Sequence, residues 1–242
     1  MRVAVISDIH ANLHALEAVL AEIDATGVDA VWSLGDTVGY GPRPNECCRI
    51  VRERTAVSLV GNHDLVALGG LAVTDFNEDA AAAAAWTSGV LTDEARGYLE
   101  GLSPEGESDG VRFFHGSARD PVWEYVVTEE AAQATLDDVQ EPLVLVGHSH
   151  FALAVTRAQG GVTGGAAPAD TELELGEARW LLNPGSVGQP RDGDPRAAWL
   201  LLDLERKFAV FRRVEYPIGQ TQAEIREQGL PEALASRLAH GD

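Results

Sequence analysis

The chain has 242 residues, with 38 acidic against 18 basic side chains and a net charge near −20. This charge opposes binding to the phosphate backbone of a long nucleic acid, so we expect no such partner. The strand-like run at residues 2–6 is too short for the core of a signal peptide, and no apolar run reaches the ~20 residues of a membrane span. We therefore expect a cytoplasmic protein with no membrane partner, folded as a single domain over residues 1–242.

The first sixty residues alternate strand and helix patterns, which is typical of parallel βαβ units. Strands are predicted at residues 2–6, 30–34 and 56–60, and helices at 13–25 and 44–54. The second helix contains the only two cysteines, the neighbours Cys47 and Cys48, which we expect to be ordinary helix residues of a protein from a reducing compartment.

Residues 65–110 are expected to form a mostly helical insertion, including the alanines at 80–85 and a segment at 92–102. An acidic helical stretch at 128–141 separates strands predicted at 111–114 and 143–146. After residue 150 the pattern changes, and the Gly- and Ala-rich residues 159–170 are expected to be a flexible loop. Further strands are predicted at 152–156, 171–175, 179–182, 197–204 and 208–216. These late strands predict a second, more antiparallel sheet packed on the first, giving an α/β sandwich flanked by helices.

Five of the apolar runs end directly in side chains that bind metals. In chain order these side chains are Asp8 and His10, Asp36, Asn62 with His63 and Asp64, His115, and His148 with His150. Functional groups collect at the carboxyl ends of strands in open α/β sheets, so these side chains predict one binuclear metal site. Asp8 and His10 are two residues apart, so an extended backbone would point both to the same side. Carboxylate, imidazole and amide ligands without cysteine suit Mn²⁺, Fe²⁺ or Zn²⁺ better than an iron–sulfur cluster.

The order of these motifs resembles the calcineurin-like metallophosphoesterase superfamily. The motifs are Ser7-Asp8-Ile9-His10, Gly35-Asp36, Gly61-Asn62-His63-Asp64, the separate His115, and Gly147-His148-Ser149-His150. The segment NPGSVGQPRDGDPR at 183–196 is similar to a compact prokaryotic branch that includes small phosphodiesterases and diadenosine tetraphosphatase-like proteins. The resemblance implies a four-layer α/β/β/α sandwich of two mixed β-sheets flanked by helices.

The resemblance also implies a role for each motif residue. One ion would be held by Asp8, His10, Asp36 and His150, and the other by Asp36, Asn62, His115 and His148. Two divalent ions, Mn²⁺ in first place with Fe²⁺, Zn²⁺ or Ni²⁺ as alternatives, would activate a bridging hydroxide for attack on phosphorus. His63 would protonate the leaving group, and Asp64 would orient the His63 ring and raise its pKa. Asp64 could instead be a turn-forming side chain.

Residues outside the motifs suggest where substrate binds. The amide of Asn12 could donate to a phosphate or cap the following helix. Arg191 and Arg196 could bind a phosphate through their planar donor forks, or pair with neighbouring aspartates. The aromatic residues Tyr40, Trp123 and Tyr125 could stack a nucleobase or belong to the core.

The favoured function is hydrolysis of small phosphate esters, either phosphodiester or dinucleoside polyphosphate bonds. A protein serine/threonine phosphatase of the same chemistry would need an extended surface groove, and the short spacings between motifs leave little chain for one. A non-catalytic metal-binding scaffold would be expected to have lost ligands, and none of the motif residues is missing. We expect the partner to be a small phosphate ester or nucleotide.

Overall fold

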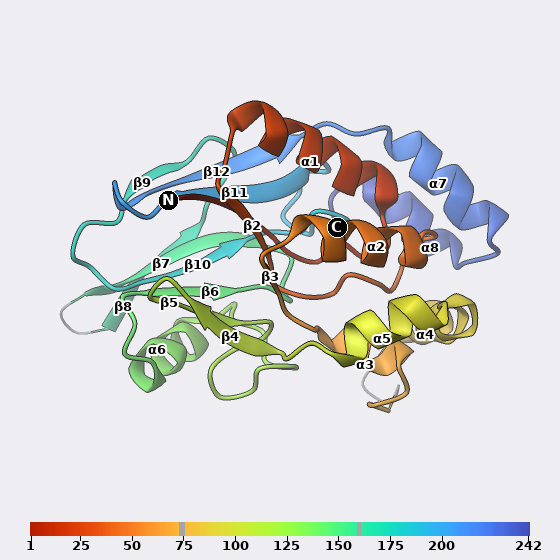
Figure 1. Ribbon diagram of the computed structural model, residues 1–242, viewed down its shortest axis with the longest axis horizontal. Helices are drawn as coiled ribbons and strands as arrows, with labels where there is room; N and C mark the ends of the chain where they lie inside the picture. Colours follow the sequence, from red (N-terminus) through yellow and green to blue (C-terminus); the bar gives the residue numbers. More distant parts are fainter. Residues whose placement is uncertain (73–75, 159–160) are drawn as a thin grey trace.

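The computed structural model describes residues 1–72, 76–158 and 161–242. Two six-stranded mixed sheets lie face to face, and helices cover both outer faces (Figure 1). The four-layer α/β/β/α sandwich predicted from the sequence is therefore confirmed. Within the described ranges, no helix is long and apolar enough to cross a membrane.

The first sheet has the strand order β3-β2-β1-β11-β12-β9. Its first three strands are parallel, and the other three pair antiparallel to their neighbours. Helices α1 and α2 pack on its outer face and return the chain between parallel strands, as βαβ units require (Figure 1). The bounds are β1 Arg2–Ile6, α1 Leu13–Thr26, β2 Ala30–Ser33, α2 Pro44–Arg54, β3 Val57–Ser58, β9 Glu172–Glu174, β11 Ala197–Asp203 and β12 Phe208–Val214.

The second sheet has the strand order β4-β5-β6-β10-β7-β8. Strands β5, β6 and β10 are parallel, while the remaining pairs are antiparallel. Helix α6 packs on the outer face of this sheet. The bounds are β4 Glu105–Ser108, β5 Val111–Phe114, α6 Glu129–Asp138, β6 Leu143–Val146, β7 Ala152–Ala158, β8 Gly161–Ala166 and β10 Trp180–Pro184.

The late strands do not form a sheet of their own, so that prediction was wrong. Strands β9, β11 and β12 extend the first sheet, whereas β7, β8 and β10 extend the second. Strands β5 and β6, which end just before His115 and His148, belong to the second sheet. The partner of a strand is set by long-range packing, which the local sequence pattern does not reveal.

Two edge strands were also missed. Gly161–Ala166, inside the predicted loop at 159–170, is β8 and pairs antiparallel with β7, while residues 159 and 160 lie outside the described residues. Glu105–Ser108, inside the predicted helical insertion, is β4 and pairs with β5. Both segments have weak intrinsic strand preference, so pairing with a neighbour decides their conformation.

The remaining helices gather at one end of the sandwich, on the right in Figure 1. Helices α4 and α5 lie in the insertion, as expected, and α3 runs into it from the motif residues 62–64, although residues 73–75 are not described. Three short helices follow the last strand, and no prediction covered them. The bounds are α3 Asn62–Ala67, α4 Glu78–Val90, α5 Asp93–Glu100, α7 Ile218–Glu227, α8 Glu232–Ser236 and the 3-10 helix η2 Arg237–Ala239. Cys47 and Cys48 are buried free thiols on α2, as predicted.

The main core lies between the two sheets. Trp32 from the first sheet and Phe113 from the second are both essentially inaccessible, with ring centroids 4.9 Å apart. This packing brings the carboxyl ends of strands from different sheets to one edge. The imidazole of His115, just after β5, donates to the carbonyl of Leu34, just after β2. The polar strand ends therefore converge from two sheets and not from one.

Candidate metal centre

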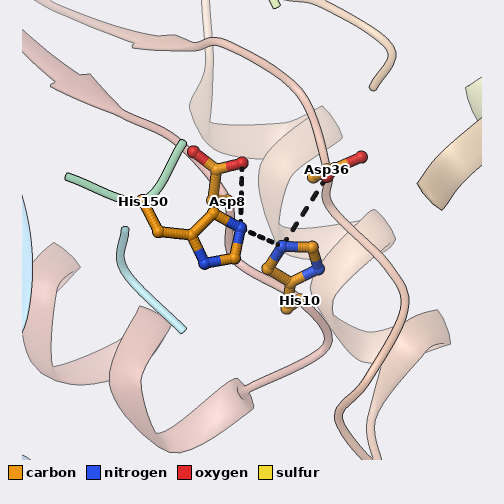
Figure 2. A group of neighbouring side chains, drawn as sticks. All are labelled: Asp8, His10, Asp36 and His150. Carbon is orange, nitrogen blue, oxygen red and sulfur yellow. Dashed lines mark hydrogen bonds and ion pairs between the residues drawn. The ribbon is translucent and has the colours of Figure 1, made fainter. Parts of the chain in front are cut away.

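Four of the predicted ligands form a buried group at this edge. The Nε2 atoms of His10 and His150 lie 2.9 Å apart. His10 Nε2 lies 3.6 Å from Asp36 Oδ2, and His150 Nε2 lies 3.6 Å from Asp8 Oδ1. Figure 2 shows both rings turned toward each other, with one carboxylate beside each. Each residue offers a ligand atom within 4.8 Å of the others, a spacing that one ion can fill.

A second group shares Asp36 with the first. Ligand atoms of Asp36, His115 and His148 also lie within 4.8 Å of one another. His115 Nε2 is 3.5 Å from Asp36 Oδ2 and 3.1 Å from Asn62 Oδ1. In the part of the chain that the structure describes, the buried Asp36 Oδ2 has no hydrogen-bond partner. The structure thus brings all seven predicted ligands together, with Asp36 between the two groups.

Backbone carbonyls fix which ring nitrogen of each histidine is free. Nδ1 donates to the Val38 carbonyl in His10 and to the Gln189 carbonyl in His150, so in both rings Nε2 is the acceptor. Burial lowers the pKa of both rings well below the usual range, which keeps them neutral. Two acceptor nitrogens 2.9 Å apart repel each other unless a cation or a proton lies between them. The donor set therefore fits a metal ion.

The second group carries more charge. Burial alone would raise the pKa of Asp36, but the neighbouring charge of His115 brings it below the ordinary carboxyl value. Burial opposes the charged form of His115 as well, yet Asp36 raises the pKa of that ring to about 9. Because a ligating imidazole must be neutral, His115 would give up a proton if this group held a metal ion.

Five of the predicted ligands have unusual backbone conformations. Asp8, His10, Asp36, His148 and His150 all lie in the left-handed region, with φ between 49° and 63°. The extended conformation predicted for the paired ligands is therefore wrong, although each pair does reach the site. Left-handed non-glycine residues are strained and persist where the surrounding structure holds them, most often at functional sites.

One glycine shows how closely the loops approach the shared carboxylate. A Cβ atom at Gly61 would lie 2.1 Å from Asp36 Oδ1, so only glycine fits there. The neighbouring backbone N–H of His63 donates to the same Asp36 Oδ1 at 2.9 Å. The Gly61-Asn62-His63 motif therefore positions Asp36 in addition to containing the predicted ligand Asn62.

His63 stands beside the centre, but Asp64 does not orient it. The His63 ring lies 4.9 Å from the His10 ring and stacks on Phe76 at 4.4 Å. The buried Asp64 carboxylate instead accepts the backbone N–H groups of Val38 and Gly61, each at 2.9 Å. Burial lowers the pKa of His63 to about 4. The predicted effect of Asp64 on His63 is thus wrong, and Asp64 ties the loops after β2 and β3 together, as a turn-forming side chain does.

A cavity of about 450 Å³ opens beside the centre. Two of the motif residues, Asn62 and His63, form part of its wall, and Arg191, predicted to bind substrate, also lines it. The three aromatic residues singled out in the sequence also line it. The remaining lining residues are Phe76, Asn77, Ala80 and Arg237.

Two predicted substrate contacts are not supported by the structure. Asn12 caps α1 through Oδ1, and its amide group donates to the Gly188 carbonyl and the Tyr216 hydroxyl, which leaves no amide hydrogen for a phosphate. Arg196 forms a two-pronged ion pair with Asp194 and does not line the cavity. Both side chains hold loops in place.

Three residues in the NPGSVGQP segment position the site, although no role was predicted for them from the sequence. The Asn183 amide donates to the Gly147 carbonyl at 2.7 Å, and the Ser186 hydroxyl donates to the Asp8 carbonyl at 2.7 Å. The Gln189 carbonyl accepts Nδ1–H of His150 at 2.6 Å. The segment therefore supports the backbone around both pairs of predicted ligands. Its Asn and Ser side chains, next to glycines in the sequence, are the feature from which such a supporting role could have been predicted.

Comparison with known proteins agrees with this geometry. Residues 1–207 match the model of the calcineurin-like phosphoesterase superfamily domain. The chain is 39% identical to the uncharacterized protein MJ0912 of Methanocaldococcus jannaschii, over 99% of this chain and 98% of that protein. The crystal structure of a metallophosphoesterase from Sphaerobacter thermophilus matches with a TM-score of 0.91 and 44% identity, over 100% of this chain and 99% of the other. The hypothetical protein PH1004 from Pyrococcus horikoshii OT3 shares the fold, with a TM-score of 0.80 and 22% identity over 100% and 98% of the two chains.

The sandwich and its edge of buried carboxylates and imidazoles define a metal-dependent phosphoesterase, a class of hydrolase. The chain belongs to the calcineurin-like phosphoesterase superfamily.

Proposed function

We propose that the protein hydrolyses small phosphate esters, namely phosphodiester or dinucleoside polyphosphate bonds, with two Mn²⁺ ions. The cavity is the observation that carries this proposal, because its ~450 Å³ lies in the ~300–1,000 Å³ range of small-ligand sites and adjoins the candidate ligands. Mn²⁺ accepts the mixture of carboxylate, imidazole and amide ligands, and no cysteine favours a softer metal.

The side chains divide the work between holding metal and handling substrate. Asp8, His10, Asp36 and His150 would hold one ion, and Asp36, Asn62, His115 and His148 the other. When bound, such ions neutralise phosphate charge and lower the pKa of water, so that a nucleophile is available at neutral pH.

His63 and Arg191 are the groups that we place on the substrate. His63 lies in the cavity wall, where Nε2 could protonate the departing oxygen, since Nδ1 is buried beside Gly39. Burial holds its pKa at about 4, so an anionic phosphate must raise the pKa when it binds if His63 is to act as an acid. The backbone N–H of Arg191 donates to the carbonyl of His150 at 3.4 Å, which sets the guanidinium beside the centre.

The size of the cavity favours small substrates over a phosphoprotein. A protein phosphatase would bind its substrate along an extended surface, whereas this cavity is bounded by helix α4 and the C-terminal helix η2. A non-catalytic scaffold would not need His63 in the cavity wall. The acidic composition also favours small substrates over long nucleic acids.

The test is turnover by metal-stripped protein reloaded with Mn²⁺. The panel contains bis-p-nitrophenyl phosphate, p-nitrophenyl phosphate, 2′,3′-cyclic AMP, diadenosine tetraphosphate and a phosphopeptide. We expect metal-dependent hydrolysis of the diesters or of the dinucleotide in preference to the phosphopeptide. Preference for the phosphopeptide would establish the protein phosphatase alternative, and two bound ions without any turnover would favour the scaffold.

A further inference from the structure

The cavity beside the metal centre carries two positive charges in a strongly acidic protein. Arg191 lies in the segment after β10, and Arg237 begins helix η2. Among the described residues that line the cavity there is no acidic side chain, although the chain as a whole has a net charge of −20. Local charge of the opposite sign attracts an anion to this place.

The two guanidinium groups lie side by side, and the charges of Asp79 and Asp242 favour the charged form of Arg237. Arg191 Nη2 and Arg237 Nη1 both donate to Gln189 Oε1, at 2.8 Å and 3.4 Å. Arg191 also donates to the Tyr40 hydroxyl at 3.2 Å, and Arg237 Nε donates to the backbone oxygen of Asp242 at 2.6 Å. Over residues 1–72, 76–158 and 161–242, neither forms an ion pair with a carboxylate side chain. Burial and the charge of Arg191 lower the pKa of Arg237, as expected for adjacent cations.

Arg237 is held in place by a packed C-terminal unit. Helices α7, α8 and η2 follow residue 207, where the match to the superfamily domain ends. Ile225, Leu234 and Leu238 from this unit pack in one cluster with Tyr40 and helix α4. The unit therefore adds a cation to the cavity from outside the matched domain and on a fixed support.

We propose that Arg191 and Arg237 together bind a second phosphate group of the substrate, next to the phosphate that is hydrolysed. The preferred substrates are then nucleoside polyphosphates or dinucleoside polyphosphates, and simple diesters are poorer. Planar guanidinium forks match phosphate oxygens in pairs, and two forks suit a doubly charged group. The rings of Phe76 and Trp123, 5.9 Å apart in the same cavity, offer apolar surface for a nucleobase.

A binding experiment tests this subsite without requiring turnover. The proposal rests on the proposed function, but inorganic pyrophosphate can be titrated calorimetrically into protein that has been treated with EDTA and dialysed. We expect R237Q to weaken pyrophosphate binding about tenfold, because one of two charged donors is lost. R237K should restore part of the affinity by keeping the charge. R226Q, which removes an exposed arginine of α7 paired with Glu232, should bind like the wild type.

Turnover then connects the subsite to substrate choice. With Mn²⁺-loaded enzyme, R237Q should lower kcat/KM for diadenosine tetraphosphate about tenfold, mainly through KM, and leave bis-p-nitrophenyl phosphate within about twofold. Equal losses on both substrates, or unchanged pyrophosphate binding in R237Q, would overturn the proposal. If the wild type hydrolyses no substrate, the proposed function fails, while the pyrophosphate titration still decides whether the two arginines form an anion subsite.

Discussion

Phe113 and His115 are two residues apart and both fully buried, yet they lie in regions that work in opposite ways. Phe113 packs between the sheets, where burial of apolar surface stabilises the fold. His115 lies at the edge of the sandwich among carboxylates and imidazoles, where burial of polar groups is unfavourable until a cation completes them. Burial alone thus does not tell structure from function, whereas the chemistry of the buried groups does.

The largest effect is expected at the carboxylate that the two groups share. Asp36→Ala removes a ligand from both groups, so binuclear metal occupancy and phosphoesterase activity should both be lost. Metal analysis after dialysis and the rate with bis-p-nitrophenyl phosphate check this. Asp138→Ala, at the exposed end of α6, is the matched control and should behave like the wild type. Full activity of D36A with two bound ions would refute the assignment.

A substitution between the sheets should reduce the stability of the fold but leave metal binding intact. Phe113→Ala leaves a cavity beside Trp32 and should lower the free energy of unfolding by about 3–5 kcal/mol. Urea denaturation followed by circular dichroism measures this loss. The folded fraction should still bind two ions, since Phe113 belongs to the apolar core between the sheets and supplies no candidate ligand. Loss of metal with unchanged stability would contradict the contrast between the two regions.

Within the site, His63 separates proton donation from metal binding. His63→Ala should spare metal binding, because the ring is not a ligand, but slow substrates with poor leaving groups about 10²–10⁴-fold. Nitrophenyl esters scarcely need a proton and should lose much less. The ratio of rates for 2′,3′-cyclic AMP and bis-p-nitrophenyl phosphate reports the difference. Equal losses on both would refute the general-acid role.

The smallest effect is expected at a link between the C-terminal unit and α2. Arg43 forms a two-pronged ion pair with Glu224 of α7, and this hydrogen bonding lowers the pKa of Glu224 below its usual 4.5. A lowered folded pKa means that the stabilisation is present above pH 4.5 and fades as the pH falls through the folded pKa. Because Arg43 is partly exposed, Glu224→Gln should reduce stability at pH 7 by about 1 kcal/mol or less.

Thermal unfolding of both proteins at pH 7 and pH 3 measures this effect. The difference between wild type and E224Q should be smaller at the lower pH. Glu232→Gln, which removes the exposed partner of Arg226, is the control and should change stability less. A difference that grows on acidification would show that the sign of the pKa shift is wrong.

The local sequence pattern correctly predicted helices and strands whose bounds depend on neighbouring residues. The helix Pro44–Arg54 was predicted with its observed bounds, because Pro44 fits the first helical turn and its missing N–H is no loss there. The strands Val111–Phe114 and Leu143–Val146 also agree, since each is a short apolar run. The candidate ligands could be singled out for the same reason, because each stands just after such a run, whereas their assignment to two ions came from the resemblance to the superfamily.

What the sequence left open depends on distant contacts. The bonds that occupy Asn12 come from residues 188, 216 and 221, far along the chain, so cap and phosphate donor could not be separated in advance. The division of strands between sheets and the left-handed backbone of Asp36 arise only when the loops meet. Arg237 gave no signal of its own, because its place in the cavity depends on how the C-terminal helices pack.

Anomalous diffraction from crystals soaked in Mn²⁺ tests the central claim most directly. The claim is that two groups of buried ligands share Asp36 and hold two ions. We predict two anomalous peaks, one on each side of Asp36, with His10 and His150 at one and His115 and His148 at the other. A single peak, or peaks away from Asp36, would contradict the account.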